Sequence, residues 1–202
     1  MIRFILITFF LTNICFAAKR SKFLPKTFQA KFEQSFKSVL SGKLEKSRGE
    51  IFYKYPGHIY FDVQFPDPFV VVANPKKTWQ YTPPYVVGEK GQVIERPSRK
   101  LTLFRFFDVL KDGLKSNALY GVEKTKKFHI IEFNKKTAKD IGIVKTELYF
   151  FNDKNPELVD LEKAILYYHD KRQVTLVLKQ MKINIPFKKG KFIFDKKKFN
   201  AE

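Results

Sequence analysis

Regular alternation of apolar and polar residues is the feature that most restricts what this chain can fold into. From Ile59 to Phe65, every second side chain is Ile, Phe or Val, and the residues between them are mostly polar. The same period of two recurs in Phe28–Phe32 and in Ile51–Tyr55. Successive side chains of a β-strand point to opposite faces, so this pattern is typical of strands buried on one face only. The sequence therefore predicts an antiparallel sheet with one face on a core.

Further strands are predicted along the rest of the chain, each bounded by residues that favour turns. Asn74–Lys77 and Asp170–Arg172 are the clearest turns, and the second has the spacing of a hairpin. No internal repeat or long linker divides the sequence, so we expect a single domain over residues 18–202. The additional strands are expected at Phe69–Ala73, Thr78–Tyr81, Tyr85–Val87, Phe128–Phe133, Val144–Phe151, Leu158–Tyr168, Gln173–Met181 and Lys191–Phe194.

One stretch in the middle of the chain has the period of a helix instead. Four apolar residues recur there at the spacing of one helix face: Leu103, Phe106, Phe107 and Leu110. Ser98 suits an N-cap and Gly113 a stop, and a second short helix is expected near Ser116–Tyr120. The predicted fold class is therefore mainly β with an α insertion.

The first seventeen residues have the composition of a secretory leader. A short basic start is followed by the mostly apolar run Phe4–Phe16, and Ala17 completes a small-x-small cleavage signal, which predicts a signal peptide over residues 1–17. An uncleaved membrane anchor is the less favoured reading, because Lys19 ends the run short of about 20 apolar residues. A lipid-modified Cys15 is also less favoured. Cys15 is the single cysteine, so no internal disulfide is possible.

Residues that could support catalysis are few and scattered. The histidines His58, His129 and His169 lack the paired spacing of metal ligands, and we expect them at strand edges or in solvent. Asp62 and Asp67 lie close in sequence, but aspartates next to turns are usually solvated. The sequence contains no nucleophile elbow, phosphate-binding loop or zinc-binding helix motif. We expect neither enzymatic activity, nor a metal, nor a cofactor.

The strong positive charge indicates contact with anionic partners. The chain has 39 Lys and Arg against 20 Asp and Glu, a net charge of +19. Lysine dominates the basic runs, whereas nucleic-acid binding favours the forked guanidinium of arginine. An exported chain also meets little nucleic acid. We therefore expect a basic surface that faces anionic lipid headgroups transiently, and no nucleic-acid partner.

The order of several motifs resembles the family of outer-membrane lipoprotein carrier protein LolA. An opening F-x-A-x-F-x-Q strand, a G-x-L-x-h-x-R-P strand and a W-x-Y strand follow one another in that family, and a D-x-x-G-Q hairpin and an F-x-F segment come later. The similar segments of this chain are Phe28–Gln34, Gly49–Pro56, Trp79–Tyr81, Asp170–Val174 and Phe192–Phe194. The segments Ile59–Val63 and Phe65–Asn74 fall between them, in the family's order.

The resemblance implies a bent antiparallel sheet that forms an incomplete β-barrel under a helical lid. It implies a periplasmic monomer that holds lipoprotein acyl chains in a hydrophobic cavity and carries them from the inner to the outer membrane. An inner-membrane ABC transporter would be the donor and an outer-membrane receptor the acceptor. Tyr55 stands where the family has an arginine that bonds the lid, so we expect Tyr55 to be the lid latch. The expected lining is Ile51, Tyr53, Ile59, Phe61, Val63, Trp79, Leu103, Phe106, Phe107 and Leu110.

Two other functions remain open at this point. The same scaffold could carry a different lipid or a glycolipid. Alternatively, the chain could be a basic periplasmic module with a dry interior, binding anionic polymers of the envelope through its lysines. Lipid bound to the purified protein would distinguish the carriers from the module.

Overall fold

The computed structural model describes residues 23–38, 41–98 and 102–201, and it leaves the side chains of residues 102–104 undescribed. In the described part the chain forms a single antiparallel sheet of eleven strands with short helices on one face. The strands are β1 (Thr27–Lys37), β2 (Leu44–Lys54), β3 (His58–Phe65), β4 (Phe69–Ala73), β5 (Lys77–Thr82), β6 (Gln92–Pro97), β7 (Tyr120–Lys124), β8 (His129–Phe133), β9 (Ile143–Phe150), β10 (Leu161–Tyr168) and β11 (Gln173–Ile183). The helices are α1 (Thr102–Val109), α2 (Lys135–Ile141) and the short 3-10 helices η2 (Leu110–Asp112) and η3 (Leu158–Asp160).

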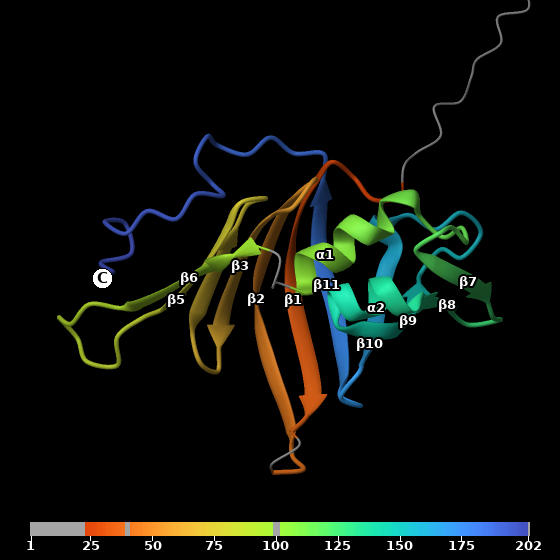
Figure 1. Ribbon diagram of the computed structural model, residues 1–202, viewed down its shortest axis with the longest axis horizontal. Coiled ribbons are helices and arrows are strands. Elements are labelled where there is room, and N and C mark those ends of the chain that lie inside the picture. Colours follow the sequence, from red (N-terminus) through yellow and green to blue (C-terminus); the bar gives the residue numbers. More distant parts are fainter. Residues whose placement is uncertain (1–22, 39–40, 99–101, 202) are drawn as a thin grey trace, which may run out of the picture.

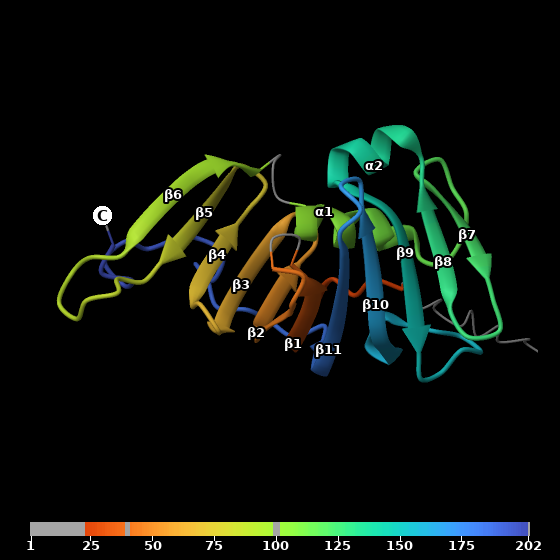
Figure 2. The same cartoon turned by 90° about the horizontal axis from the view of Figure 1, so that it is seen from below.

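The sheet is open rather than closed into a barrel. Its strand order is β6-β5-β4-β3-β2-β1-β11-β10-β9-β8-β7, so two meanders meet where β1 pairs with β11. The sheet bends, and α1 and α2 lie on its inner face (Figure 1, Figure 2). The predicted fold class, an incomplete barrel covered by helices, is confirmed.

The alternation in the sequence becomes alternation of burial. Ile59, Phe61 and Val63 of β3 are buried, whereas the side chains between them are only half-buried. At Gly49 of β2, an added Cβ would lie 1.8 Å from the Asp62 carbonyl oxygen of β3. Only glycine fits there, and the register between β2 and β3 shifts between Arg48 and Gly49.

The predicted mid-chain helix is present as α1, continued by η2 and followed by Gly113. Ser98 was predicted to cap this helix, but its hydroxyl instead donates a hydrogen bond to the Asn74 carbonyl oxygen. The helix predicted near Ser116–Tyr120 is wrong. Asn117 instead organises a turn there, since its side-chain oxygen accepts from the backbone N–H of Leu119 at 2.8 Å. That turn leads directly into β7.

Two predicted strands are wrong, the first residues of a third, Leu158–Asp160, form the 3-10 helix η3, and three further elements were not predicted. Tyr85–Val87 lies in the loop between β5 and β6, and Lys191–Phe194 forms turns instead of a closing strand. The sequence analysis missed β6, β7 and α2. Helix α2 carries clear end signals, because the Asn134 side chain accepts from the Thr137 N–H and Gly142 closes the helix in the left-handed conformation.

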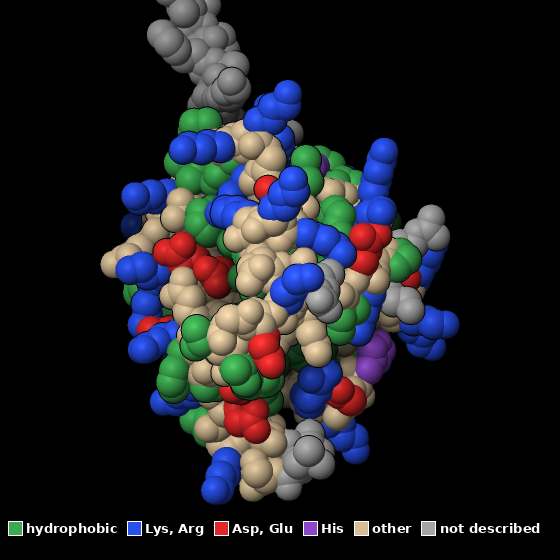
Figure 3. Space-filling view, turned by 90° about the vertical axis from the view of Figure 1, so that its left-hand side faces the viewer, with side chains coloured by type: hydrophobic (Ala, Val, Ile, Leu, Met, Phe, Trp, Pro, Cys, Tyr) green, Lys and Arg blue, Asp and Glu red, His purple; other side chains and the backbone are tan. Residues whose placement is uncertain are grey.

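The C-terminal tail, residues 184–201, covers the outer face of the sheet with a second, smaller apolar cluster. Phe194 stacks on Trp79 with ring centroids 6.5 Å apart, and Phe199 approaches Tyr81 to 5.0 Å. The ammonium group of Lys191 lies 3.5 Å from the ring centroid of Phe52. Lys and Arg side chains stand out over this end of the molecule (Figure 3). The strands β2–β4 thus pack against other side chains on both faces.

The predicted signal peptide, residues 1–17, lies outside the described residues. No helix within the described ranges is long and apolar enough to cross a membrane. Ahead of β1, Phe23 and Leu24 pack into the core instead of forming a helix.

Candidate functional site

Most residues predicted to line a cavity meet between the inner face of the sheet and α1. Strands β2 and β3 supply five of them, because their register sets Ile51 opposite Phe61 and Tyr53 opposite Ile59. Helix α1 and η2 supply the rest. The residues brought together are all buried: Ile51, Tyr53, Ile59, Phe61, Val63, Phe106, Phe107 and Leu110.

Two predicted lining residues are not part of this group. Trp79 lies on the outer face, where it is paired with Val72, stacks on Phe194 and donates its indole N–H to Glu95 at 2.9 Å. Period-two alternation along β5 sends its side chain away from α1. The side chain of Leu103 lies outside the part of the chain that the structure describes.

Aromatic rings fill the space between sheet and helix. Phe107 contacts Phe28 and Tyr53, with ring centroids 5.2 and 5.5 Å away. Farther along the sheet, Phe32 and Phe61 stack at 4.3 Å. Phe28 and Phe32 were not among the predicted lining residues, although their alternation in the opening strand placed them on the same face. The result is an apolar, aromatic sheet face with α1 as its cover.

A polar link holds α1 on this face. The Tyr53 hydroxyl donates a hydrogen bond to Asp108 of α1, and the Gly57 N–H donates to the same carboxyl oxygen at 3.1 Å. Burial and the neighbouring Asp108 raise the pKa of Tyr53 above its ordinary value, so the phenol remains a donor at neutral pH. The link therefore persists whenever α1 is seated.

The sequence predicts Tyr55 as the latch, but the bond to α1 comes from Tyr53. Tyr55 is two residues farther along, is 38% exposed, and its backbone N–H donates to the Lys26 carbonyl oxygen. Asp108 was also missed. The sequence did hold a clue to Asp108, because this carboxyl group directly follows Phe106 and Phe107 in the predicted helix.

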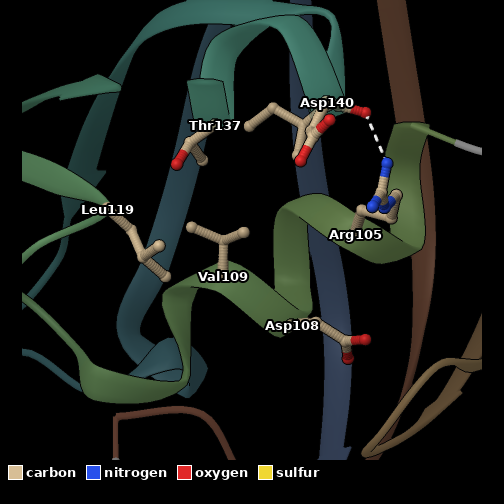
Figure 4. A pocket seen from close by; sticks show the side chains of 7 residues that line it. Arg105, Asp108, Val109, Leu119, Thr137 and Asp140 are labelled. Atoms are coloured by element: carbon tan, nitrogen blue, oxygen red, sulfur yellow. Dashed lines mark hydrogen bonds between the residues drawn. The ribbon is translucent and has the colours of Figure 1, made fainter. Parts of the chain in front are cut away.

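A small pocket opens between α1 and α2, beyond the aromatic face (Figure 4). It has a volume of about 190 Å³, and Arg105 bridges its rim by donating to the Asp140 carbonyl oxygen at 2.8 Å. Val109 and Leu119 form part of its apolar wall. This bridge ties α1 to α2, so α1 is bonded at Asp108 to the sheet and at Arg105 to its neighbour.

One histidine differs from expectation. His129 is buried, and its Nε2 lies 2.8 Å from an oxygen of Asp153. Hydrogen bonds from Lys124 and from His129 hold the pKa of Asp153 below its usual value. Across the described ranges, no group of three or more His, Cys, Asp or Glu is placed to hold a metal ion.

Comparison with known proteins settles the family. Residues 25–195, which contain every strand and helix described above, match the family of outer membrane lipoprotein carrier protein LolA. The chain belongs to the LolA family. An outer-membrane lipoprotein carrier protein of Idiomarina loihiensis is 36% identical over 58 residues, a match that spans 29% of this chain and 29% of that relative.

Two solved structures are similar to this chain at low sequence identity. A LolA superfamily protein from Nitrosomonas europaea is 10% identical with a TM-score of 0.49, over 86% of this chain and 93% of that one. A putative outer membrane lipoprotein-sorting protein domain from Vibrio parahaemolyticus is 12% identical with a TM-score of 0.45, over 87% and 92% of the two chains.

Proposed function

We propose that this LolA-family chain is a periplasmic carrier that shelters the acyl chains of lipoproteins on the inner face of its sheet, under α1. One observation carries the proposal: an eight-residue helix seats Phe106 and Phe107 on an aromatic sheet face and is bonded to that face through Asp108. A short cover of this kind can leave without unravelling the strands beneath it.

The cargo supplies the reason for such a cover. Each exposed CH₂ group costs about 0.8 kcal/mol in water, so one chain of about 14 carbons costs roughly 10 kcal/mol. In the seated state the rings of α1 occupy the space, so room for an acyl chain arises when α1 swings away. Acyl chains would then replace Phe107 against Phe28 and Tyr53. The seated helix hides the same apolar surface when the carrier is empty.

The donor and acceptor belong to this proposal as well. We expect an inner-membrane ABC transporter to load the carrier and an outer-membrane receptor to unload it, with transfer driven by differences in affinity. No bond is made or broken in such a transfer, so the carrier needs no catalytic residue.

The proposal is tested by what the protein holds and takes up. Solvent extracts of purified protein, analysed by mass spectrometry, should contain acylated lipopeptide, and the empty protein should take up a fluorescent lipopeptide with little dependence on salt. Free lipid or glycolipid in the extract would favour the alternative carrier. An acyl-free extract together with no uptake would contradict both carriers.

A matched pair of variants locates the site. Phe69 and Val70 are neighbours on β4 and both half-buried, but Phe69 packs on the inner cluster and Val70 on the outer one. Phe69→Glu should weaken uptake about tenfold or more, since it removes contact with a few CH₂ groups and adds a charge. Val70→Glu should leave uptake unchanged. Equal effects of the two substitutions would refute the inner-face site.

A further inference from the structure

The loop between β5 and β6 exposes a cluster of apolar side chains. Tyr85, Val86 and Val87 are 96%, 57% and 101% exposed, in a tip held by a turn in which the Glu89 N–H donates to the Val86 carbonyl oxygen. Single exposed apolar residues are common on protein surfaces. Three in a row at the tip of a loop that extends from the end of the molecule are not, and they need a partner (Figure 1).

Lysines of the C-terminal tail lie beside the base of this loop. The Gly91 N–H donates to the Asn200 carbonyl oxygen at 3.1 Å, and the Asn200 side chain donates to the Glu89 carbonyl oxygen at 3.4 Å. The turn that these bonds fix carries Lys196, Lys197 and Lys198, all exposed.

Positive charge exceeds negative charge at this end of the molecule. Residues 188–198 hold six lysines and one aspartate, Asp195. Glu89 lies in the loop itself, and Glu95 of β6 is paired with Lys77 at 2.6 Å. Basic side chains accordingly surround this face of the molecule (Figure 3).

We propose that the β5–β6 loop and the tail lysines form a docking surface for an anionic lipid bilayer. Tyrosine and valine at a loop tip suit the boundary between headgroups and acyl chains, and adjacent lysines suit anionic headgroups. A hydrated anionic polymer would pair with the lysines but would leave Tyr85 and Val87 in water. The bilayer is therefore the partner whose chemistry matches both parts of the surface.

This inference goes beyond the proposed function and does not depend on it. The docking surface lies at the β6 edge and on the outer face, whereas acyl chains would lie on the inner face under α1. Phe69→Glu, which should impair loading, should therefore leave membrane docking unchanged.

The test is sedimentation of the purified protein with vesicles. Wild-type protein should bind vesicles of phosphatidylethanolamine and phosphatidylglycerol and should not bind phosphatidylcholine vesicles. The K196Q/K197Q/K198Q variant should bind about 100-fold more weakly, because each basic side chain near an anionic surface contributes about a factor of five. The Y85S/V87S variant should bind about tenfold more weakly or worse.

Matched controls test whether binding depends on this particular surface, or only on the net charge and exposed apolar area of the protein. K135Q/K136Q/K139Q removes the same charge from exposed positions on α2, and F151S removes a 78% exposed apolar ring after β9. Both variants should bind anionic vesicles as the wild type does. Equal loss in K135Q/K136Q/K139Q and K196Q/K197Q/K198Q, or full binding by Y85S/V87S, would overturn the proposal.

A second measurement reports insertion without removing any part of the surface. Val87→Cys can carry an environment-sensitive fluorophore, because the single native cysteine, Cys15, lies in the predicted signal peptide. Its emission should shift to the blue on anionic vesicles, as the probe leaves water. An unshifted emission on vesicles that bind the protein would show that the loop stays outside the bilayer, and binding to a polyanion but not to vesicles would show that the partner is a polymer. Either outcome would overturn the proposal.

Discussion

At the scale of single residues, the bond between Tyr53 and Asp108 decides how firmly α1 is seated. The phenol comes from a buried position on β2 and the carboxyl group from α1, so the bond joins the two layers. The family resemblance pointed to the residue before the proline, Tyr55, because a family position was carried over. Tyr53 lies within β2 and packs against Phe107 of the helix, whereas Tyr55 lies past the last residue of β2, in the turn before β3.

Removing the Tyr53 hydroxyl should loosen the cover. Tyr53→Phe keeps the ring but deletes a hydrogen bond whose loss costs about 1 to 3 kcal/mol. We expect faster hydrogen exchange of the α1 amides and faster uptake of a fluorescent lipopeptide. Tyr55→Phe is the control and should change neither rate. A larger increase in these two rates for Tyr55→Phe than for Tyr53→Phe would show that Tyr55 is the latch.

Tyr167 gives the fold a pH dependence on the alkaline side. Its hydroxyl donates to Glu147 at 3.0 Å, and burial together with that bond raises the pKa of Tyr167 from 10.0 to about 12. The raised pKa means that the stabilisation is fully present below pH 10 and is lost as the pH rises toward 12.

The comparison with Tyr167→Phe isolates the contribution of the Tyr167–Glu147 site, because tyrosines that do not share Glu147 titrate equally in both proteins. Urea unfolding between pH 9.5 and about 12 should show a steeper fall in the free energy of unfolding for the wild type. If the free energy of unfolding fell equally with pH in the two proteins, Tyr167 would not contribute to the pH dependence of stability.

At the scale of elements, predictability followed the strength of the periodic signal. The long alternating strands and α1 were predicted because their patterns extend over several turns or pleats. Helix α2 was missed because seven residues with three lysines show little apolar periodicity, although Asn134 and Gly142 marked its ends. Tyr85–Val87 was predicted as a strand only because its residues favour β structure. Pro83 and Pro84 precede it, and proline cannot donate a backbone hydrogen bond to a neighbouring strand, so the segment forms a loop.

The tail is an element whose attachment can be measured. Phe194 is buried against Trp79 and Tyr81. Phe194→Ala should lower the free energy of unfolding by about 2 to 4 kcal/mol and should speed tryptic cleavage at Lys196–Lys198, because the tail loses its main anchor. Phe151→Ala, at an exposed ring, should change neither. Unaltered cleavage of the Phe194 variant would show that other contacts hold the tail.

At the scale of the whole molecule, the sequence predicted an antiparallel sheet with one face on a core, and the family resemblance implied that it bends, but neither indicated what covers the outer face. Strand alternation grouped five of the ten expected lining residues, and the period of the helix grouped three more; these eight are buried neighbours. Alternation does not tell which face meets α1, so Trp79 was assigned to the wrong side. The position of the tail depends on contacts between segments more than 100 residues apart, such as Trp79 with Phe194, which no local pattern specifies.

The packing of β2–β4 on both faces has a mechanical consequence. The C-terminal tail packs on the outer face of these strands through its aromatic rings, and the ammonium group of Lys191 lies over the rings of Phe52 and Tyr60. A sheet backed in this way keeps its curvature when the helix in front departs. The sheet would then stay rigid while α1 alone moves, and the free energy of opening would be that of breaking the contacts of α1.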